Sequence, residues 1–143
     1  MNLLQAMVAP LAGGRRFFRS VQWSGSHRKS LAMIAQDAAD IAAIDCVTFE
    51  HLRTLEPALV AAVRVIGWSD ASPGLPLVTS AGTDDRTVTA LRAAFADTLA
   101  DRAVVPTLDA LLIDGFDVLS IDAYESVLEL ERRAVALGYP ELA

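Results

Sequence analysis

Short runs rich in apolar residues alternate with helical patterns between residues 21 and 66, and this order constrains the fold most. The runs are Val21-Gln-Trp23, Ile41-Ala-Ala-Ile44 and Val63-Arg-Val-Ile66. Helical spacing separates them, first after Ser26 and again from Phe49 to about Leu55. The order strand, helix, strand, helix, strand is typical of a parallel sheet that is covered by helices. The sequence therefore predicts an α/β fold.

Helices are also expected outside this region. Apolar residues recur at helical spacing from Leu3 to Leu11, and Gly13-Gly14 ends the pattern. A long helix is expected from near Thr83, with an apolar stripe that faces a core. A last helix is expected from about Asp122 to Gly138, after a strand at Phe116-Asp-Val-Leu119.

The charged residues are unevenly distributed. The net charge is −6, which argues against a nucleic-acid-binding protein. All 18 acidic residues lie at or after Asp37, whereas five of the 12 cations precede it. These five are Arg15, Arg16, Arg19, Arg28 and Lys29. The first quarter is therefore either a solvated basic face or a positive field that attracts a small anion.

Composition and the N-terminus limit the classes of protein. Hydrophobic residues make up 53% of the chain, which is slightly high for a soluble domain and suggests a missing neighbour. No run approaches the roughly 20 apolar residues of a membrane span. The N-terminus has no cationic n-region, and an amphipathic helix is expected there, not a signal peptide. The single Cys46 excludes an internal disulfide.

The turn Trp23-Ser-Gly-Ser-His-Arg-Lys-Ser30 collects polar and basic residues between an expected strand and an expected helix. Free backbone N–H groups at such a helix N-terminus bind phosphate-like or carboxylate anions. Gly25 allows close approach of the backbone, and Ser24, Ser26 and His27 add side-chain donors. The alternative is that Ser26 only caps the helix and that His27 is an ordinary surface residue.

Asp45 ends an apolar run, where a carboxylate needs a partner. It either caps the next helix or faces the same crevice as His27 and binds a cationic or hydroxyl group of a ligand. A Cys46–His27 nucleophile pair and a Ser26–His27–Asp45 acyl-transfer set are further options, although the chain has no Gly-x-Ser-x-Gly motif. Two histidines and one cysteine lack metal-ligand spacing, and neither a metal nor a cofactor is expected.

Four segments carry a resemblance to a known family. They are Gly25-Ser-His27-Arg-Lys-Ser30-Leu, Ala38-Ala-Asp40-Ile-Ala-Ala-Ile-Asp45-Cys, Ser72-Pro-Gly-Leu-Pro76 and Gly115-Phe. In this order and spacing, the chain resembles the phosphate, phosphite and phosphonate-binding proteins of ABC transporters, which are type 2 periplasmic binding proteins. The resemblance implies one parallel-sheet lobe and an incomplete second α/β lobe, with an oxyanion in the cleft between them.

The resemblance also implies where the two lobes lie in the sequence and what the protein does. Residues 1–70 would be the second, cleft-forming lobe, nearly complete, and residues 71–143 would be the hinge return and the C-terminal part of the first lobe. The chain would be a non-enzymatic solute-binding component of an ABC-type importer, with a small oxyanion and a membrane permease as partners. Its location would be the periplasm, although no signal peptide is expected in this chain. The implied ligand-binding residues are Ser24, Gly25, Ser26, His27 and Asp45.

Two other functions are compatible with the sequence. Because the resemblance covers only the C-terminal half of a full family member, the chain could be an N-terminally truncated remnant that binds nothing. Such a remnant could form a homodimer through an exposed sheet edge. The chain could also be a small hydrolase that uses Cys46 or Ser26 as its nucleophile.

Overall fold

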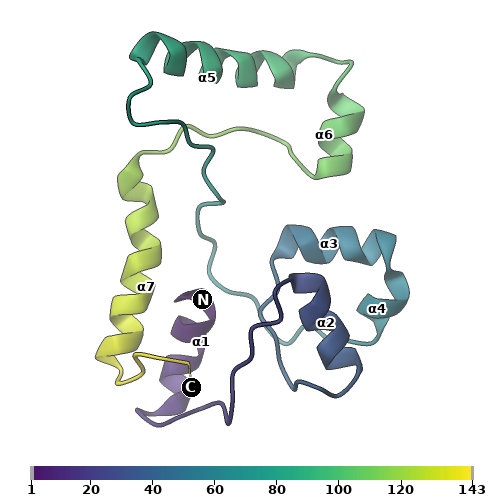
Figure 1. Ribbon diagram of the computed structural model, residues 1–143, viewed down its shortest axis with the longest axis vertical. Coiled ribbons are helices and arrows are strands. Elements are labelled where there is room, and N and C mark those ends of the chain that lie inside the picture. The colour runs from purple at the N-terminus through teal and green to yellow at the C-terminus, as the bar shows by residue number, and fades with distance from the viewer. Residues whose placement is uncertain (1, 143) are drawn as a thin grey trace. The chain divides into compact units, whose positions relative to one another are not determined.

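The computed structural model describes residues 2–142 as helices joined by extended segments (Figure 1). The elements are α1 (Asn2–Ala12), α2 (His27–Ala35), α3 (Cys46–Leu55), α4 (Pro57–Ala61), α5 (Asp85–Ala100), α6 (Val105–Leu111), the 3-10 helix η1 (Ile121–Tyr124) and α7 (Glu125–Ala136). The chain divides into two compact units. Unit 1 comprises residues 1–72 and 125–143, and unit 2 comprises residues 73–124.

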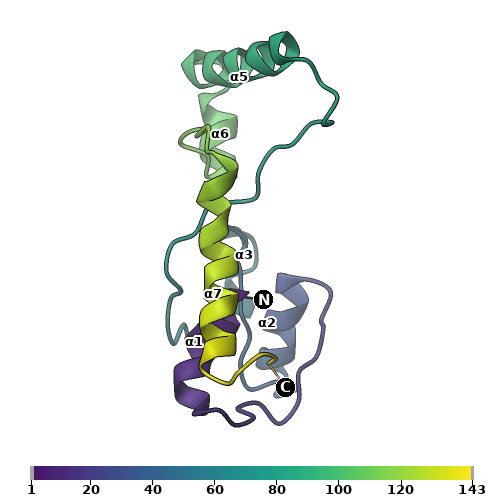
Figure 2. The ribbon, with the colours of Figure 1, turned by 90° about the vertical axis from the view of Figure 1, so that its left-hand side faces the viewer.

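The predicted α/β fold is wrong, because residues 2–142 contain no β-strand. The runs at 41–44, 63–66 and 116–119 are extended segments without a backbone ladder, and Figure 2 draws such links as plain coil. Ile66 and Val118, which should lie in a buried sheet, are 68% and 65% exposed. A strand needs a neighbour at about 4.8 Å to pair its N–H and C=O groups, whereas a helix pairs them within itself. Without a sheet in this part of the chain, a dimer through a sheet edge loses its basis.

The expected helices are present, although the third and the last begin at other residues than the sequence predicts. α1 ends at Gly13 and Gly14, which adopt positive φ angles of 58° and 71°. α2 follows Ser26, and α5 begins at Asp85, close to the expected start near Thr83. The last helix, α7, begins at Glu125, and the 3-10 helix η1 takes the place of its expected first turn. None of the helices in residues 2–142 is long and apolar enough to cross a membrane.

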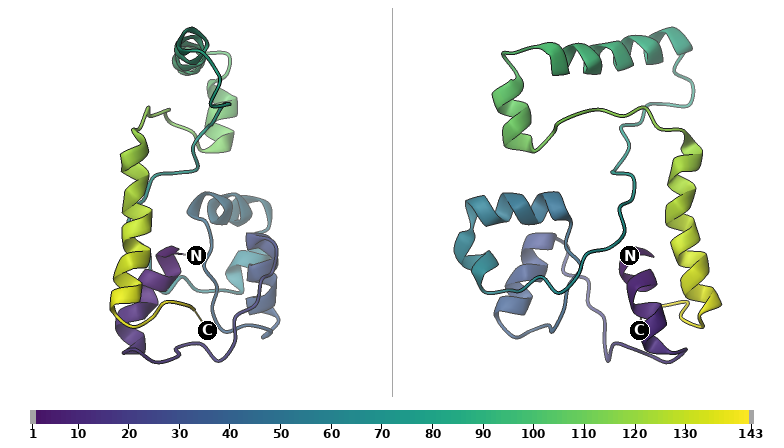
Figure 3. Two further views of the ribbon diagram at one scale, coloured as in Figure 1. Left: turned by 60° about the vertical axis from the view of Figure 1, so that its left-hand side comes forward. Right: turned by 180° about the vertical axis from the view of Figure 1, so that it is seen from behind.

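The main core of unit 1 lies between α1 and α7, which pack side by side (Figure 3). Small residues make this contact: Ala9 and Ala134 are 1% and 0% exposed. The buried cluster comprises Val8, Ala9, Ala12, Ala134, Tyr139 and Leu142, with Leu4 and Phe18 packed against it. Alanines let the two backbones approach closely, and the C-terminal residues Tyr139 and Leu142 fold back into the same cluster.

Polar contacts hold this C-terminal segment in place. The Gln5 side chain is buried, and its Nε2 donates to the carbonyl oxygens of Tyr139 at 3.0 Å and Pro140 at 2.7 Å. The Tyr139 hydroxyl donates to the Leu142 carbonyl at 2.7 Å. A buried amide or phenol without a partner would cost free energy, and both groups here are satisfied.

The rest of unit 1 is a group of three helices, α2, α3 and α4, in which α2 packs on both others. Apolar burial in this group is small: α2 buries Leu31, α3 buries Leu52, and α4 buries no side chain. Polar contacts therefore have a larger share in setting how these helices are oriented.

Unit 2 contains α5, α6 and η1. None of the residues 73–124 is buried. The expected buried stripe of α5 is wrong: Leu91 and Phe95 are 44% and 36% exposed. The ring of Phe95 does contact that of Phe116, with centroids 4.9 Å apart. This contact is too small to form a closed core, and the stripe of α5 stays largely open to solvent.

Candidate functional site

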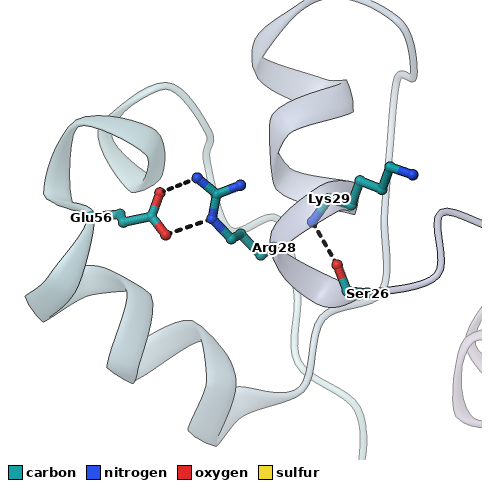
Figure 4. A network of polar contacts seen from close by, with 4 residues as sticks. All are labelled: Ser26, Arg28, Lys29 and Glu56. Carbon is teal, nitrogen blue, oxygen red and sulfur yellow. Dashed lines mark hydrogen bonds and ion pairs between the residues drawn. The ribbon is translucent and has the colours of Figure 1, made fainter.

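The N-terminal turn of α2 is built by its own hydroxyl groups. Ser26 is the N-cap in an extended conformation, and its Oγ accepts a hydrogen bond from the Lys29 N–H at 3.2 Å (Figure 4). Ser24 Oγ donates to the Ser26 carbonyl at 2.9 Å and lies 2.7 Å from Ser30 Oγ. The two serines thus hold the turn from both sides, and the prediction that Ser26 caps this helix is confirmed.

Gly25 opens the backbone of this turn to solvent. Its φ of +86° lies in the region that glycine adopts without strain. A Cβ atom at this position would meet no heavy atom within 4 Å. The glycine is therefore required by backbone conformation and not by a crowded neighbour, and the turn stays accessible.

The N-terminus of α3 is capped by Asp45. Its Oδ2 accepts the Thr48 N–H at 2.7 Å, which confirms the capping alternative. The pKa of Asp45 is lowered, chiefly by this Thr48 backbone N–H and to a smaller extent by the Thr48 hydroxyl. Asp45 is thus an anionic cap whose second oxygen can still accept a hydrogen bond.

One contact connects the two helix N-termini. The backbone N–H of Asp45 donates to Nδ1 of His27 at 3.5 Å, although the residues are 18 positions apart in sequence. When Nδ1 of a neutral imidazole accepts, the ring proton is on Nε2, which then acts as a donor. Both residues are exposed, so this donor is accessible to a ligand. The structure therefore brings together all five predicted residues: Ser24, Gly25, Ser26, His27 and Asp45.

The first turn of α2 has an unusual charge. It contains His27, Arg28 and Lys29 and no acidic residue. Cations at a helix N-terminus oppose the helix dipole, typically by about 0.3–1 kcal/mol each. Arg28 is offset by Glu56, whereas Lys29 forms no ion pair with residues 2–142. The turn thus keeps one uncompensated cation beside the exposed backbone.

Sequence reasoning missed the ion pair between Arg28 and Glu56. Nε of Arg28 lies 2.6 Å from Oε1 of Glu56, and Nη2 lies 2.6 Å from Oε2 (Figure 4). The pair lowers the pKa of Glu56, mainly through these hydrogen bonds. The two residues are 28 positions apart, and no local pattern in the sequence signals their contact.

The acyl-transfer alternative lacks its geometry. In an acyl-transfer triad, Nδ1–H of the histidine donates to the carboxylate, but here Nδ1 of His27 accepts from the Asp45 backbone. The Asp45 carboxylate is held by Thr48, and Cys46 is an exposed residue in the first turn of α3. Among residues 2–142, no three His, Cys, Asp or Glu side chains come together as a metal-ligand set.

Comparison with known proteins identifies the family. A family model described as "ABC transporter, phosphonate, periplasmic substrate-binding protein" matches residues 3–124, which is most of the chain. The chain therefore belongs to this family of transporter binding proteins, and the resemblance seen in the sequence is confirmed. The family is periplasmic and is named for phosphonate. No match was found among curated proteins or among solved structures.

Proposed function

We propose that this chain is the solute-binding component of an ABC-type importer and binds a small oxyanion at the N-termini of α2 and α3. Phosphate, phosphite or a phosphonate would be the ligand. The observation that carries the proposal is the contact of two capped helix N-termini through His27 and Asp45, in a member of a phosphonate-binding family. The proposed ligand-binding residues are Ser24, Gly25, Ser26, His27 and Asp45.

The donors of this site suit a tetrahedral oxyanion. The first turn of a helix has N–H groups without intrahelical partners, together with a partial positive charge. The open turn at Gly25 lets a ligand reach these groups. Nε2 of His27 and the Ser26 hydroxyl add directional hydrogen bonds, and Lys29 adds charge, whereas the Ser24 hydroxyl already donates to the Ser26 carbonyl. Donors of three chemical kinds would thus meet the ligand's oxygens.

Asp45 has a different part in this proposal. A carboxylate cannot donate to an oxyanion, and its Oδ2 is occupied by the Thr48 N–H. Its other oxygen would accept from a protonated ligand oxygen or from a ligand amine. Asp45 would thus select for ligands that carry a donor beside the anionic group.

No step of this function makes or breaks a covalent bond, and the proposal is therefore non-enzymatic. Residues 1–70 would form the cleft-forming lobe, with the hinge return and the C-terminal part of the first lobe in residues 71–143. Ligand binding would favour a closed state, which a membrane permease would recognise.

A thermal-shift series tests the proposal. The purified chain would be melted with increasing phosphate, phosphite, methylphosphonate or 2-aminoethylphosphonate, with sulfate as the control. A ligand that binds only the folded state stabilises it by about 2.7 kcal/mol at 100 times its dissociation constant. We expect a dose-dependent rise for at least one of the phosphorus oxyanions, and the absence of any rise would overturn the proposal.

A matched pair of histidine variants tests the site. His27→Ala removes the Nε2 donor, whereas His51→Ala removes the other histidine from within α3. We expect His27→Ala to lose most of the ligand-induced rise and His51→Ala to keep it, with unliganded melting temperatures close to the wild type in both. Equal ligand responses of His27→Ala and the wild type would contradict the site assignment.

A further inference from the structure

Arg28 and Glu56 connect two parts of the three-helix group. Arg28 lies in the first turn of α2, and Glu56 is both the C-cap of α3 and the residue before α4. Their two contacts of 2.6 Å are parallel, with Nε and Nη2 each facing one carboxylate oxygen (Figure 4). Bidentate pairs of this kind fix direction as well as distance.

The position of this pair lets it affect the orientation of α2 as well as the free energy of unfolding. α2 buries Leu31 and α3 buries Leu52, so apolar packing leaves the orientation of these helices weakly determined. The hydrogen bond from Asp45 N–H to His27 Nδ1 is long, at 3.5 Å, and a small rotation of α2 would break it. A bidentate contact close to His27 would resist that rotation.

We propose that Arg28 and Glu56 form a positioning clamp, which holds the first turn of α2 against the junction of α3 and α4 and so keeps His27 in contact with Asp45. In this role, Arg28 is a positioning residue, because Glu56 occupies Nε and Nη2 of its guanidinium. The consequence for ligand affinity rests on the proposed function, but the effect on His27 and Asp45 does not.

The competing role for Arg28 is that of a cation that binds the ligand directly. The two roles predict opposite effects of Glu56→Gln, which removes the negative charge and keeps a side chain of similar shape. If Arg28 is a ligand-binding cation, its release from Glu56 strengthens binding of an anion. If it is a clamp, its release lets α2 rotate and weakens binding. Arg28→Lys separates the roles again, since it keeps the charge but loses the bidentate geometry.

The chain supplies a matched control. Glu50 on α3 forms a single contact of 2.6 Å with Arg53, three residues further along the same helix. Glu50→Gln therefore removes the same charge from a similar ion pair, but this pair connects no two helices. General effects of a lost negative charge would appear in Glu50→Gln as well as in Glu56→Gln.

The first measurement needs no ligand. Hydrogen exchange of the Asp45 amide and the nitrogen chemical shifts of the His27 ring report on the contact directly. We expect Glu56→Gln and Arg28→Lys to speed exchange of the Asp45 amide about threefold and to shift the Nδ1 resonance, with Glu50→Gln unchanged. Wild-type behaviour of both readouts in Glu56→Gln would overturn the clamp.

The second measurement is the affinity for phosphite in the same variants. We expect Glu56→Gln and Arg28→Lys each to weaken binding severalfold and their combination to be no worse than either one, since both break one contact. Stronger binding in Glu56→Gln, with Arg28→Lys unchanged, would overturn the clamp in favour of a ligand-binding cation. If the wild type binds none of the oxyanions, the proposed function fails, and the exchange of the Asp45 amide still decides on the clamp.

Discussion

The C-terminal end of α7 gives a test of the packing in unit 1 through the single change Gly138→Ala. The Gly138 N–H donates to the Val135 carbonyl at 2.9 Å, and the Tyr139 N–H donates to the Ala134 carbonyl at 3.0 Å. This pair of bonds is a Schellman motif with Gly138 at the left-handed position, where φ is +74°. The reversal turns Tyr139 back onto Ala134, and both side chains are buried.

Two costs of the substitution follow from the structure. An L-residue in the left-handed conformation costs about 1–2 kcal/mol. Alanine also reduces the conformational entropy of the unfolded chain, which favours folding, but by less than this cost. In addition, a Cβ atom at Gly138 would lie 3.4 Å from Cα of Gly14, so that neighbour would have to move slightly. We therefore expect Gly138→Ala to lower the free energy of unfolding by about 1–2 kcal/mol.

Two further glycines separate these costs. Gly13 has a φ of +58° but no heavy atom within 4 Å of the added Cβ, so Gly13→Ala has the conformational cost alone. Gly67 does not have a positive φ, and its Cβ would be in ordinary contact with Met7, so Gly67→Ala should change stability by less than about 0.5 kcal/mol.

Urea unfolding followed by circular dichroism, together with hydrogen exchange of the Tyr139 amide, measures these differences. The expected order of destabilisation is Gly138→Ala, then Gly13→Ala, then Gly67→Ala. If Gly138→Ala unfolds at the wild-type urea concentration and keeps its Tyr139 amide protected, the reasoning from the left-handed turn and its packing is refuted.

Two more predictions concern a helix end and a helix cap. Leu112 follows α6 with a φ of +58° and is 47% exposed, so Leu112→Gly should relieve backbone strain that outweighs the loss of a half-buried side chain. We expect a gain of about 0.5 kcal/mol in the stability of α6, seen as slower amide exchange, and faster exchange would contradict it. The Thr48 N–H holds the pKa of Asp45 below its unfolded value of about 4. The ionised carboxylate therefore stabilises the folded state fully at pH values above about 4. This stabilisation disappears as the pH falls through the lowered pKa of the folded state. Asp45→Asn keeps a capping oxygen without the titrating charge, and the stability difference from the wild type should therefore shrink on acidification; a constant difference in urea unfolding would refute this.

The helices could be predicted because their signals lie within a few residues. Ser26 caps α2 through Lys29, and Gly13 ends α1 directly after its last residue. The apolar pattern predicts the start of α3 at Phe49, three residues too late, although Asp45 and Thr48 have the spacing of a cap and its amide. In each case a side chain and a backbone group close together in sequence decide where the helix begins or ends.

The strands could not be predicted correctly, because pairing is not a local property. An apolar run such as 41–44 fits a buried strand, but only a neighbouring strand can satisfy its backbone groups. Within residues 2–142 no such partner is in place, and Ile41 is 36% exposed. The same holds for the α5 stripe, since helical spacing shows that a face is apolar but not what covers it.

The candidate site depends on one feature that is local in sequence and on one that is not. The turn at residues 24–27 is local, and its serine cap and open glycine follow from adjacent residues. The meeting of His27 with Asp45 across 18 residues depends on how α2 lies against α3. The sequence therefore predicts two half-sites, each with its own helix N-terminus, but not the angle between them.

That angle decides whether the halves act on one ligand. Two helix N-termini add their fields at a shared point only if both first turns face it, and the field of each falls off within about one turn. Leu31 and Leu52 bury too little surface to fix the angle by packing alone. The pair of Arg28 with Glu56 is bidentate and lies one residue from His27, which makes it the contact best placed to set this geometry. A loss of ligand response in Glu56→Gln without any loss of helix content would place the origin of affinity in the relation between the helices and not in either turn alone.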